Sequence, residues 1–271
     1  TKETGILFIF VILFYRILFH KPGIFLFIAS TICTLVIYFA IRFGAGVYFE
    51  TLQNIPLNKL SLPERLIHIP AMIFYYLKTV VYPTSLAHNQ LWVITQNTFQ
   101  NVYFPMIIVC LFFIFTALFG IYIHKVIKKI FKVYIFFLMW FFIGLAMHLN
   151  IFPLDQTVAD RWFYFPLVGL LGMIGVGVEL IMHKRKQLEK VIVIIFVVIL
   201  VFLSIQTIIR NTNWVDAITL YKHDMKIHNN FDIETNLATE YLLDHKYNDA
   251  ELHFKRSIDM FPYESNLYNL A

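Results

Sequence analysis

An acidic and a basic residue, Asp160 and Arg161, stand directly before a run of aromatic residues in the stretch VADRWFYFP (158–166). A guanidinium group can bind phosphate oxygens through two parallel hydrogen bonds, so Arg161 is a candidate phosphate ligand at a membrane surface. Asp160 would then orient Arg161, and Tyr164 would line the pocket. The structural alternative is that the two charges satisfy each other at the level of the lipid headgroups while residues 162–164 form an aromatic belt.

A second cation, Lys78, lies within the apolar stretch 69–82. It is either a second phosphate contact or a lysine whose long side chain extends to the membrane surface. His148, Asn150 and Asp155 suggest one corner of a metal site. No helical histidine pair or carboxylate cluster completes that corner, so no metal site is predicted. The sequence shows no evident cofactor site, and a divalent cation is left open only for protein outside this chain.

The composition indicates a membrane protein. Hydrophobic residues make up 59% of the 271 residues and charged residues only 14%, whereas soluble domains carry about 25% charged residues. The net charge is +5, but residues 210–271 hold 6 basic and 10 acidic residues, so the basic excess lies in residues 1–209. Such an excess beside apolar segments is a topology signal and does not argue for nucleic-acid binding. Cys33 and Cys110 lie in apolar stretches and predict no disulfide.

Several apolar stretches are long enough to cross a bilayer, which takes roughly 17–25 helical residues. Five of them reach that length: 23–41, 103–123, 133–149, 163–182 and 191–209. Stretch 5–19 is shorter, and 69–82 is marginal because of Lys78, so it either spans or is re-entrant. A polytopic helix bundle with about six to seven spans is therefore expected within residues 1–209. The glycines of 169–177 lie inside a span and predict close helix packing.

The distribution of basic residues predicts the orientation of the bundle. The loops 124–132 and 183–190 together hold eight of the 22 basic residues, so both are expected to be cytoplasmic. The segments then placed outside are 84–101, 150–162 and everything after residue 209. The N-terminal half stays open. If 69–82 spans, residues 1–3 are cytoplasmic, and if it is re-entrant they are outside.

Residues 231–271 show the spacing of a tetratricopeptide repeat, a unit of two packed helices. The positions that match are Leu237, Ala238, Tyr241, Tyr247, Ala250, Phe254 and Pro262. Residues 210–230 read as an amphipathic helix that connects the membrane part to this repeat, with Trp214 at the interface. One repeat cannot bury its apolar face alone, so further repeats are expected after Ala271 and the chain is interpreted as an internal fragment.

Several stretches resemble a family of membrane proteins that join a multi-span glycosyltransferase domain to tetratricopeptide repeats. VADRWFYFPLVGL (158–170) resembles the family's AERYLYLPSLGL, and TKETGI (1–6) resembles a Lys-Glu motif that opens a membrane helix. PERLIHIPAMIFYYLKTVVYPTSLA (63–87) and RNTNWVDAITLYKHD (210–224) resemble the family's middle segment and the helix that leads into the repeats. The animal members are the transmembrane and tetratricopeptide-repeat-containing O-mannosyltransferases, and bacteria have relatives.

The resemblance implies site residues by position. Lys2 and Glu3 match the Lys-Glu motif, and Arg65 matches the arginine of the middle segment. The positions that match ERYLY include Asp160, Arg161 and Tyr164. Asp stands where Glu is usual, and Trp and Phe replace the Tyr and Leu that follow the arginine.

The resemblance also implies an all-helical, GT-C type domain that transfers a sugar from a polyprenyl-phosphate carrier on the extracytoplasmic side. The family's catalytic acidic residues lie in the first extracytoplasmic loop, which would precede Thr1, so the catalytic residues of this chain are unknown. The leading hypothesis is a fragment of a glycosyltransferase that acts on protein and is located in a bacterial inner membrane, with the repeat outside. The alternative is a membrane-anchored scaffold without enzymatic activity, whose repeats assemble envelope proteins.

Overall fold

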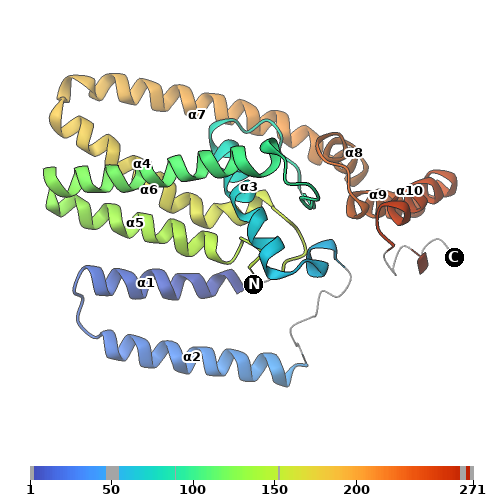
Figure 1. Cartoon of the computed structure of the whole chain (residues 1–271), viewed down its shortest axis with the longest axis horizontal. Coiled ribbons are helices and arrows are strands. Elements are labelled where there is room, and N and C mark those ends of the chain that lie inside the picture. The colour runs from blue at the N-terminus through green and yellow to red at the C-terminus, as the bar shows by residue number, and fades with distance from the viewer. Residues whose placement is uncertain (1–2, 47–54, 89, 152, 263–266, 269–271) are drawn as a thin grey trace.

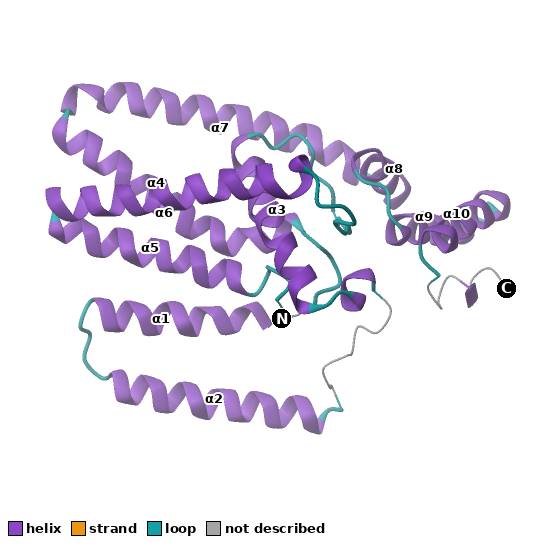
Figure 2. Cartoon of the chain, in the orientation of Figure 1, coloured by secondary structure: helices purple, strands orange, loops and turns teal. Residues whose placement is uncertain are grey.

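The computed structural model describes residues 3–46, 55–88, 90–151, 153–262 and 267–268, and these residues form helices, turns and loops (Figure 2). The helices of the membrane part are α1 (Leu7–Leu18), α2 (Ile24–Gly44), α3 (Leu62–Val81), α4 (Phe104–Val126), α5 (Lys128–Ala146), α6 (Tyr164–Lys184) and α7 (Glu189–Asn211). The C-terminal helices are α8 (Ala217–Ile227), α9 (Phe231–Leu243) and α10 (Tyr247–Met260). Short 3-10 or π turns precede several of them.

Five helical segments of the described chain are long and apolar enough to cross a membrane. They are Ile24–Gly44, Phe99–Val126, Lys128–Ala146, Asp160–Lys184 and Lys186–Trp214. Each contains one of the five apolar stretches that the sequence predicts as spans, or nearly all of it, so the prediction of an all-helical membrane part is confirmed. The helix α1 is also apolar but has only 12 residues.

Helix α3 differs from its neighbours in direction. It begins with a capping box in which the Ser61 backbone N–H donates to Glu64 Oε2 at 2.7 Å, and Pro63 lies in its first turn. Figure 1 shows α3 running across one end of the bundle, where α4 and α6 begin and α5 and α7 end. It is not among the five membrane-capable segments. Whether stretch 69–82 spans or is re-entrant therefore stays a prediction, and the start of α1 lies at the same end of the bundle as α8–α10 (Figure 1).

The tightest packing in the bundle joins α5 to α6. A Cβ atom added to Gly169 would lie 2.4 Å from the backbone nitrogen of Phe141, and one added to Gly144 would lie 2.8 Å from that of Pro166. Only glycine lets the two backbones approach this closely, which confirms the predicted role of Gly169. Gly175 has open space around its Cβ position and takes no part in this contact.

The helices α9 and α10 form an antiparallel hairpin, and α8 packs against α9. The residues that form the buried core of the hairpin are Leu237, Ala238, Tyr241, Ala250 and Phe254. Five of the seven predicted packing positions thus lie where the repeat pattern predicts. Tyr247 does not, because it is the first residue of α10 and its side chain is 61% exposed. Pro262 is exposed and follows the end of α10 at Met260, as expected for a residue that cannot continue a helix.

The segment that joins the bundle to this hairpin differs from the single amphipathic helix expected for 210–230. The helix α7 continues to Asn211, a 3-10 turn spans Thr212–Trp214, and α8 begins at Ala217. Asp216 caps α8 by accepting a hydrogen bond from the Thr219 backbone N–H at 2.7 Å. The resulting change of direction brings α8 back against the loops at the end of the bundle.

Candidate functional site

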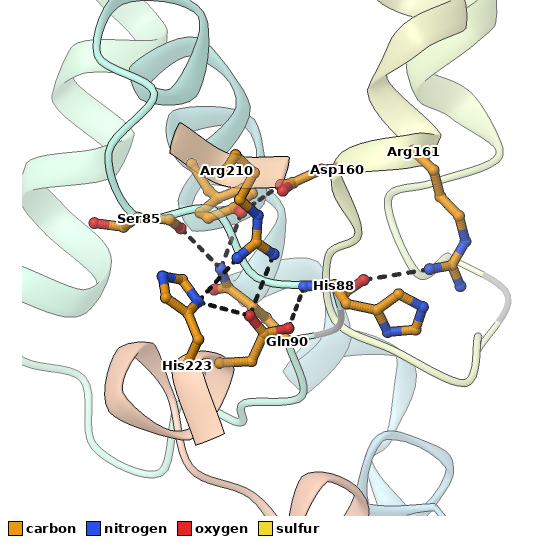
Figure 3. Close-up of polar contacts among 9 residues, drawn as sticks. Ser85, His88, Gln90, Asp160, Arg161, Arg210 and His223 are labelled. Carbon is orange, nitrogen blue, oxygen red and sulfur yellow. Dashed lines mark hydrogen bonds and ion pairs between the residues drawn. The ribbon is translucent and has the colours of Figure 1, made fainter. Parts of the chain in front are cut away.

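Polar side chains from several segments lie close to Asp160 and Arg161, at the end of the bundle that carries α3 (Figure 3). Both residues belong to the 3-10 helix η4 (Asp160–Phe163), which leads into α6. The segment 83–98 lies beside η4, because Gln90 and Val158 form an isolated antiparallel bridge. The end of α7 and the helix α8 complete the group from the other side.

Asp160 is bound by a tyrosine of α3. The Tyr75 hydroxyl donates to Asp160 Oδ1 at 2.6 Å and accepts a hydrogen bond from Gln90 Nε2 at 2.9 Å. Burial raises the pKa of Tyr75, and the negative charge of Asp160 raises it further. The tyrosine therefore stays protonated and keeps donating to the carboxylate, which fixes the start of η4 against α3.

Arg161 points away from Asp160, as Figure 3 shows. Its Nη1 donates to the His88 carbonyl at 3.3 Å and its Nη2 donates to Gln156 Oε1 at 3.4 Å, while its guanidinium lies 5.9 Å from the Trp162 ring centroid. The two charges do not satisfy each other as the structural alternative expects, since consecutive helical residues do not face each other. In the described structure Arg161 has neutral partners at long distances.

The predicted aromatic belt is wrong for two of its three members. Trp162 is 9% exposed and stacks on His148 with a centroid distance of 5.3 Å, and Phe163 stacks on Tyr76 at 4.8 Å. Tyr164 is 72% exposed at the start of α6. Among the described residues a side chain this exposed lines no enclosed pocket, so the pocket role of Tyr164 stays a prediction, and a place at the membrane surface fits it.

A second arginine, Arg210 at the end of α7, lies in a buried ion cluster. Arg210 Nη2 is 3.2 Å from Asp224 Oδ1, and His223 Nδ1 is 3.0 Å from the same oxygen. The other oxygen, Oδ2, accepts from the His88 backbone N–H at 2.6 Å. Asp224 is 1% exposed, so this cluster ties α8 to α7 and to the segment 83–98.

Sequence reasoning missed this ion cluster. Arg210 and Asp224 are the first and last residues of the stretch RNTNWVDAITLYKHD. The stretch stands out in the sequence, but the ion pair between its two ends was not predicted. A separation of 14 residues brings two side chains together only when the chain turns between them, and the turn at Thr212–Trp214 does this. The only signal in the sequence was the acidic residue Asp224, at the end of a stretch with the pattern of an amphipathic helix.

The other predicted site residues are spread over the structure. Lys2 lies outside the described residues, and Glu3 begins the 3-10 helix η1 (Glu3–Ile6) beside the start of α1. Arg65 donates to the Leu60 carbonyl at 3.2 Å, and it lies about 15 Å along α3 from Tyr75 at 1.5 Å per residue. Lys78 is exposed on α3, about one turn after Tyr75. Of these predicted site residues, only Lys78 therefore lies close along the chain to Tyr75, which binds Asp160.

Burial lowers the pKa of two histidines near these loops, His148 after α5 and His68 within α3. Burial lowers the pKa of His148 to about 4, and its Nε2 has no hydrogen-bond partner. His68 accepts from the Ile94 backbone N–H at 2.8 Å, and burial lowers its pKa as well. Asn150, the proposed neighbour of His148 in a metal corner, instead donates to the Gln156 and Thr157 carbonyls. Within the described residues, no group of three His, Cys, Asp or Glu side chains could hold a metal ion.

Comparison with known proteins gives a partial similarity. Over 77 residues the chain is 30% identical to the protein O-mannosyl-transferase Tmtc2 of Drosophila melanogaster. The aligned part covers 28% of this chain and 8% of the length of that protein. No protein-family profile matches the chain, and no solved structure matches it. The chain is thus distantly similar, over part of its length, to an O-mannosyl-transferase, and its five apolar helices mark it as a membrane protein.

Proposed function

We propose that this chain is part of a membrane glycosyltransferase that transfers a sugar from a polyprenyl-phosphate donor to a protein on the extracytoplasmic side. The observation that carries the proposal is Arg161, a guanidinium fixed at the end of an apolar bundle by neutral partners. The partial similarity to an O-mannosyl-transferase supports the same reaction class. The proposal also places the repeat outside and the protein in a bacterial inner membrane.

The chemistry of this transfer needs a cation near the phosphate. When the bond between sugar and phosphate breaks, negative charge grows on the leaving phosphate oxygens, and fixed donors aimed at them lower the barrier. Arg161 donates to two neutral oxygens at 3.3 and 3.4 Å, which are long for charge-assisted hydrogen bonds. A phosphate can replace these acceptors without breaking an ion pair. Lys78, exposed on α3, is the proposed second cation.

Asp160 has a different role in this proposal from the one expected from the sequence. Its carboxylate is bound by Tyr75 on the side away from Arg161, so it fixes the backbone of η4. Arg161, the next residue, then projects toward the opposite side. Asp160 is thus a positioning residue that acts through the backbone. The carboxylate that takes the proton of the acceptor hydroxyl is proposed to come from a loop that precedes Thr1 in the full protein.

The hairpin of α9 and α10 is proposed to hold the protein acceptor. Its buried core fixes the two helices, and it leaves large apolar side chains on the surface, among them Leu243 at 68% and Leu252 at 45% exposure. Tyr247 adds an exposed aromatic ring at the start of α10. Exposed apolar groups of this size on a helical repeat are suited to contacts with another chain.

The proposal is tested with the full-length protein in membranes, supplied with labelled polyprenyl-phosphate sugars and an extract of envelope proteins. Transfer of label to protein should fall about 10²–10³-fold in Arg161→Gln, the usual cost of losing one donor that stabilises a developing oxyanion. Arg185→Gln is the matched control, because Arg185 is an exposed arginine at the opposite end of the bundle, just after α6. Both variants are checked for folding by size-exclusion chromatography.

The scaffold alternative predicts another outcome. If the wild-type protein transfers no label from any donor, while envelope proteins still co-purify with it, the proposed transferase is wrong and the scaffold is supported. If transfer occurs and Arg161→Gln leaves it unchanged, the reaction class stands and the phosphate site lies elsewhere.

A further inference from the structure

The opposite end of the bundle contains an apolar groove between α4 and α5. Its volume is about 400 Å³, within the range of roughly 300–1,000 Å³ that small-molecule sites occupy. Ala117 and Ile121 of α4 and Ile135 and Leu138 of α5 are among the residues that line it. Ile121 is 54% exposed, so the groove opens on the outer surface of the bundle.

Gly120 allows the Tyr134 ring to form the floor of the groove. A Cβ atom on Gly120 would lie 3.0 Å from the Tyr134 ring, so the ring lies directly against the α4 backbone. The Tyr134 hydroxyl donates to the Thr116 carbonyl at 2.6 Å and is thereby kept out of the groove. The floor therefore presents the apolar face of a buried ring, which suits a hydrocarbon chain and offers little to a polar ligand.

The mouth of the groove is basic. His124 and Lys125, in the last turn of α4, line the same groove. Lys184, at the end of α6, donates to the Tyr122 hydroxyl at 2.6 Å, and Tyr122 lies one turn before Lys125. The two loops at this end, 124–132 and 183–190, hold eight basic residues.

Few acidic residues offset this charge. Glu179 and Glu189 are the acidic residues near the two basic loops, and Glu189 begins α7. The loop between α1 and α2 lies at the same end of the bundle and adds Lys21 (Figure 1). The apolar groove thus ends in a region of strong positive charge at the membrane surface.

We infer that this groove binds an anionic phospholipid, with one acyl chain between α4 and α5 and the headgroup phosphate beside Lys125 and Lys184. An apolar groove open to the lipid already has hydrocarbon available to fill it, and the basic mouth selects the headgroup by charge. Each lysine near an anionic membrane surface contributes about 1 kcal/mol of attraction. This inference does not depend on the proposed transferase activity, because the groove and Arg161 lie at opposite ends of the bundle.

The test uses the full-length protein in phosphatidylcholine nanodiscs that contain a small fraction of photoactivatable phosphatidylglycerol. Cross-linked peptides are mapped by mass spectrometry. We expect labelling to concentrate within residues 116–138 and to be clearly weaker with photoactivatable phosphatidylcholine. Ala117→Phe fills the groove from an exposed position and should remove most of this labelling. Lys125→Gln should weaken it about fivefold, which corresponds to the contribution of one lysine.

Two control variants separate the groove from its surroundings. Leu118→Phe adds an aromatic ring to an outer position of the same helix, since Leu118 is 61% exposed and does not line the groove. Lys226→Gln removes one exposed lysine of α8, at the other end of the molecule. Both should label like the wild type. Equal labelling by the two lipids, or labelling of Ala117→Phe at the wild-type level, would overturn the inference.

Discussion

Arg161 and Arg210 lie at the same end of the molecule, yet their surroundings differ. Arg210 donates to Asp224, which is 1% exposed, and lies 5.8 Å from the Trp214 ring centroid. Arg161 has only neutral oxygen partners, at 3.3 and 3.4 Å. One guanidinium is neutralised within the fold, and the other keeps its charge for a partner that comes from outside.

This difference separates two uses of the same side chain. A buried ion pair is costly to form, but once formed it is costly to break, because a lone charge is then left without solvent. Such a pair fixes the position of α8 and the hairpin against the bundle. An arginine with neutral partners contributes little to stability and can exchange them for an anion. The expected effects of substitutions on stability and binding differ accordingly.

The largest effect on stability is expected from Asp224→Asn. This substitution leaves the Arg210 charge without its carboxylate partner, and breaking a buried pair in this way costs about 3–5 kcal/mol. The loss should appear as a lower midpoint of thermal unfolding in detergent and as faster proteolysis within 210–230. Asp259→Asn, at an exposed position of α10, should stay within about 0.5 kcal/mol of wild type. Equal stability of the two variants would contradict a structural role for the pair.

Lower pH should reduce the stability of the fold around Arg161. The group responsible is His148, whose ring stacks on Trp162, the residue after Arg161. Its pKa is about 4 in the folded protein, below the value of about 6.5 expected when the chain is unfolded. Between these values the unfolded chain binds a proton that the folded chain does not. The free energy of unfolding should therefore fall by up to about 1.4 kcal/mol per pH unit from about pH 6.5 down to about pH 4.

This pH dependence is checked by unfolding His148→Phe over the same range. Phenylalanine retains a ring that can stack on Trp162, and the unpaired Nε2 of His148 means that no hydrogen bond from that atom is lost. The variant should lose less stability than wild type as the pH falls. If the two proteins show the same pH profile, His148 is not the group responsible.

A smaller loss is expected from Tyr75→Phe. The substitution removes the hydrogen bond that Asp160 accepts and one of the two that Gln90 Nε2 donates. Leaving the partly buried Asp160 oxygen without this donor costs about 1–3 kcal/mol. Because Tyr75 fixes η4, binding of polyprenyl phosphate should weaken too. Tyr221→Phe is a useful control on α8, where the ring is half-buried. If Tyr75→Phe binds polyprenyl phosphate with an unchanged dissociation constant, Asp160 does not position Arg161.

The smallest effect on stability is expected from Arg161→Gln. Its two long hydrogen bonds go to neutral acceptors, so the free energy of unfolding should change by no more than about 0.5 kcal/mol. Binding of polyprenyl phosphate should nevertheless weaken about tenfold, as expected for loss of a charge-assisted contact. Equilibrium binding in nanodiscs measures this change. A large loss of stability would mean that Arg161 is a structural residue like Arg210.

The sequence predicted the helical spans well because a bilayer imposes a length and composition that each segment must meet alone. It also predicted the core of the hairpin, where small Ala238 and Ala250 let α9 and α10 approach. The direction of the side chains at residues 160–164 was not predictable in this way. It depends on Tyr75, Tyr76 and His148, which come from elsewhere in the chain.

The same limit applies to the ion cluster of Arg210 and Asp224. Its formation requires the turn between α7 and α8 and the return of the segment 83–98, and neither follows from local spacing. The sequence left open whether 69–82 spans or is re-entrant, because Lys78 lies within an apolar stretch. The contact of Tyr75 of α3 with η4, at one end of the bundle, could not be predicted from this composition.

The direction of α3 affects which helix ends lie together. With α3 across one end of the bundle, α1 and α2 form one antiparallel pair and α4–α7 form two more, and each pair begins and ends at that end (Figure 1). The start of α1 lies beside the start of α6, where the Phe8 and Phe165 rings are 4.8 Å apart between centroids. A loop joined to the chain ahead of η1 would therefore emerge at the end of the bundle that also carries Arg161.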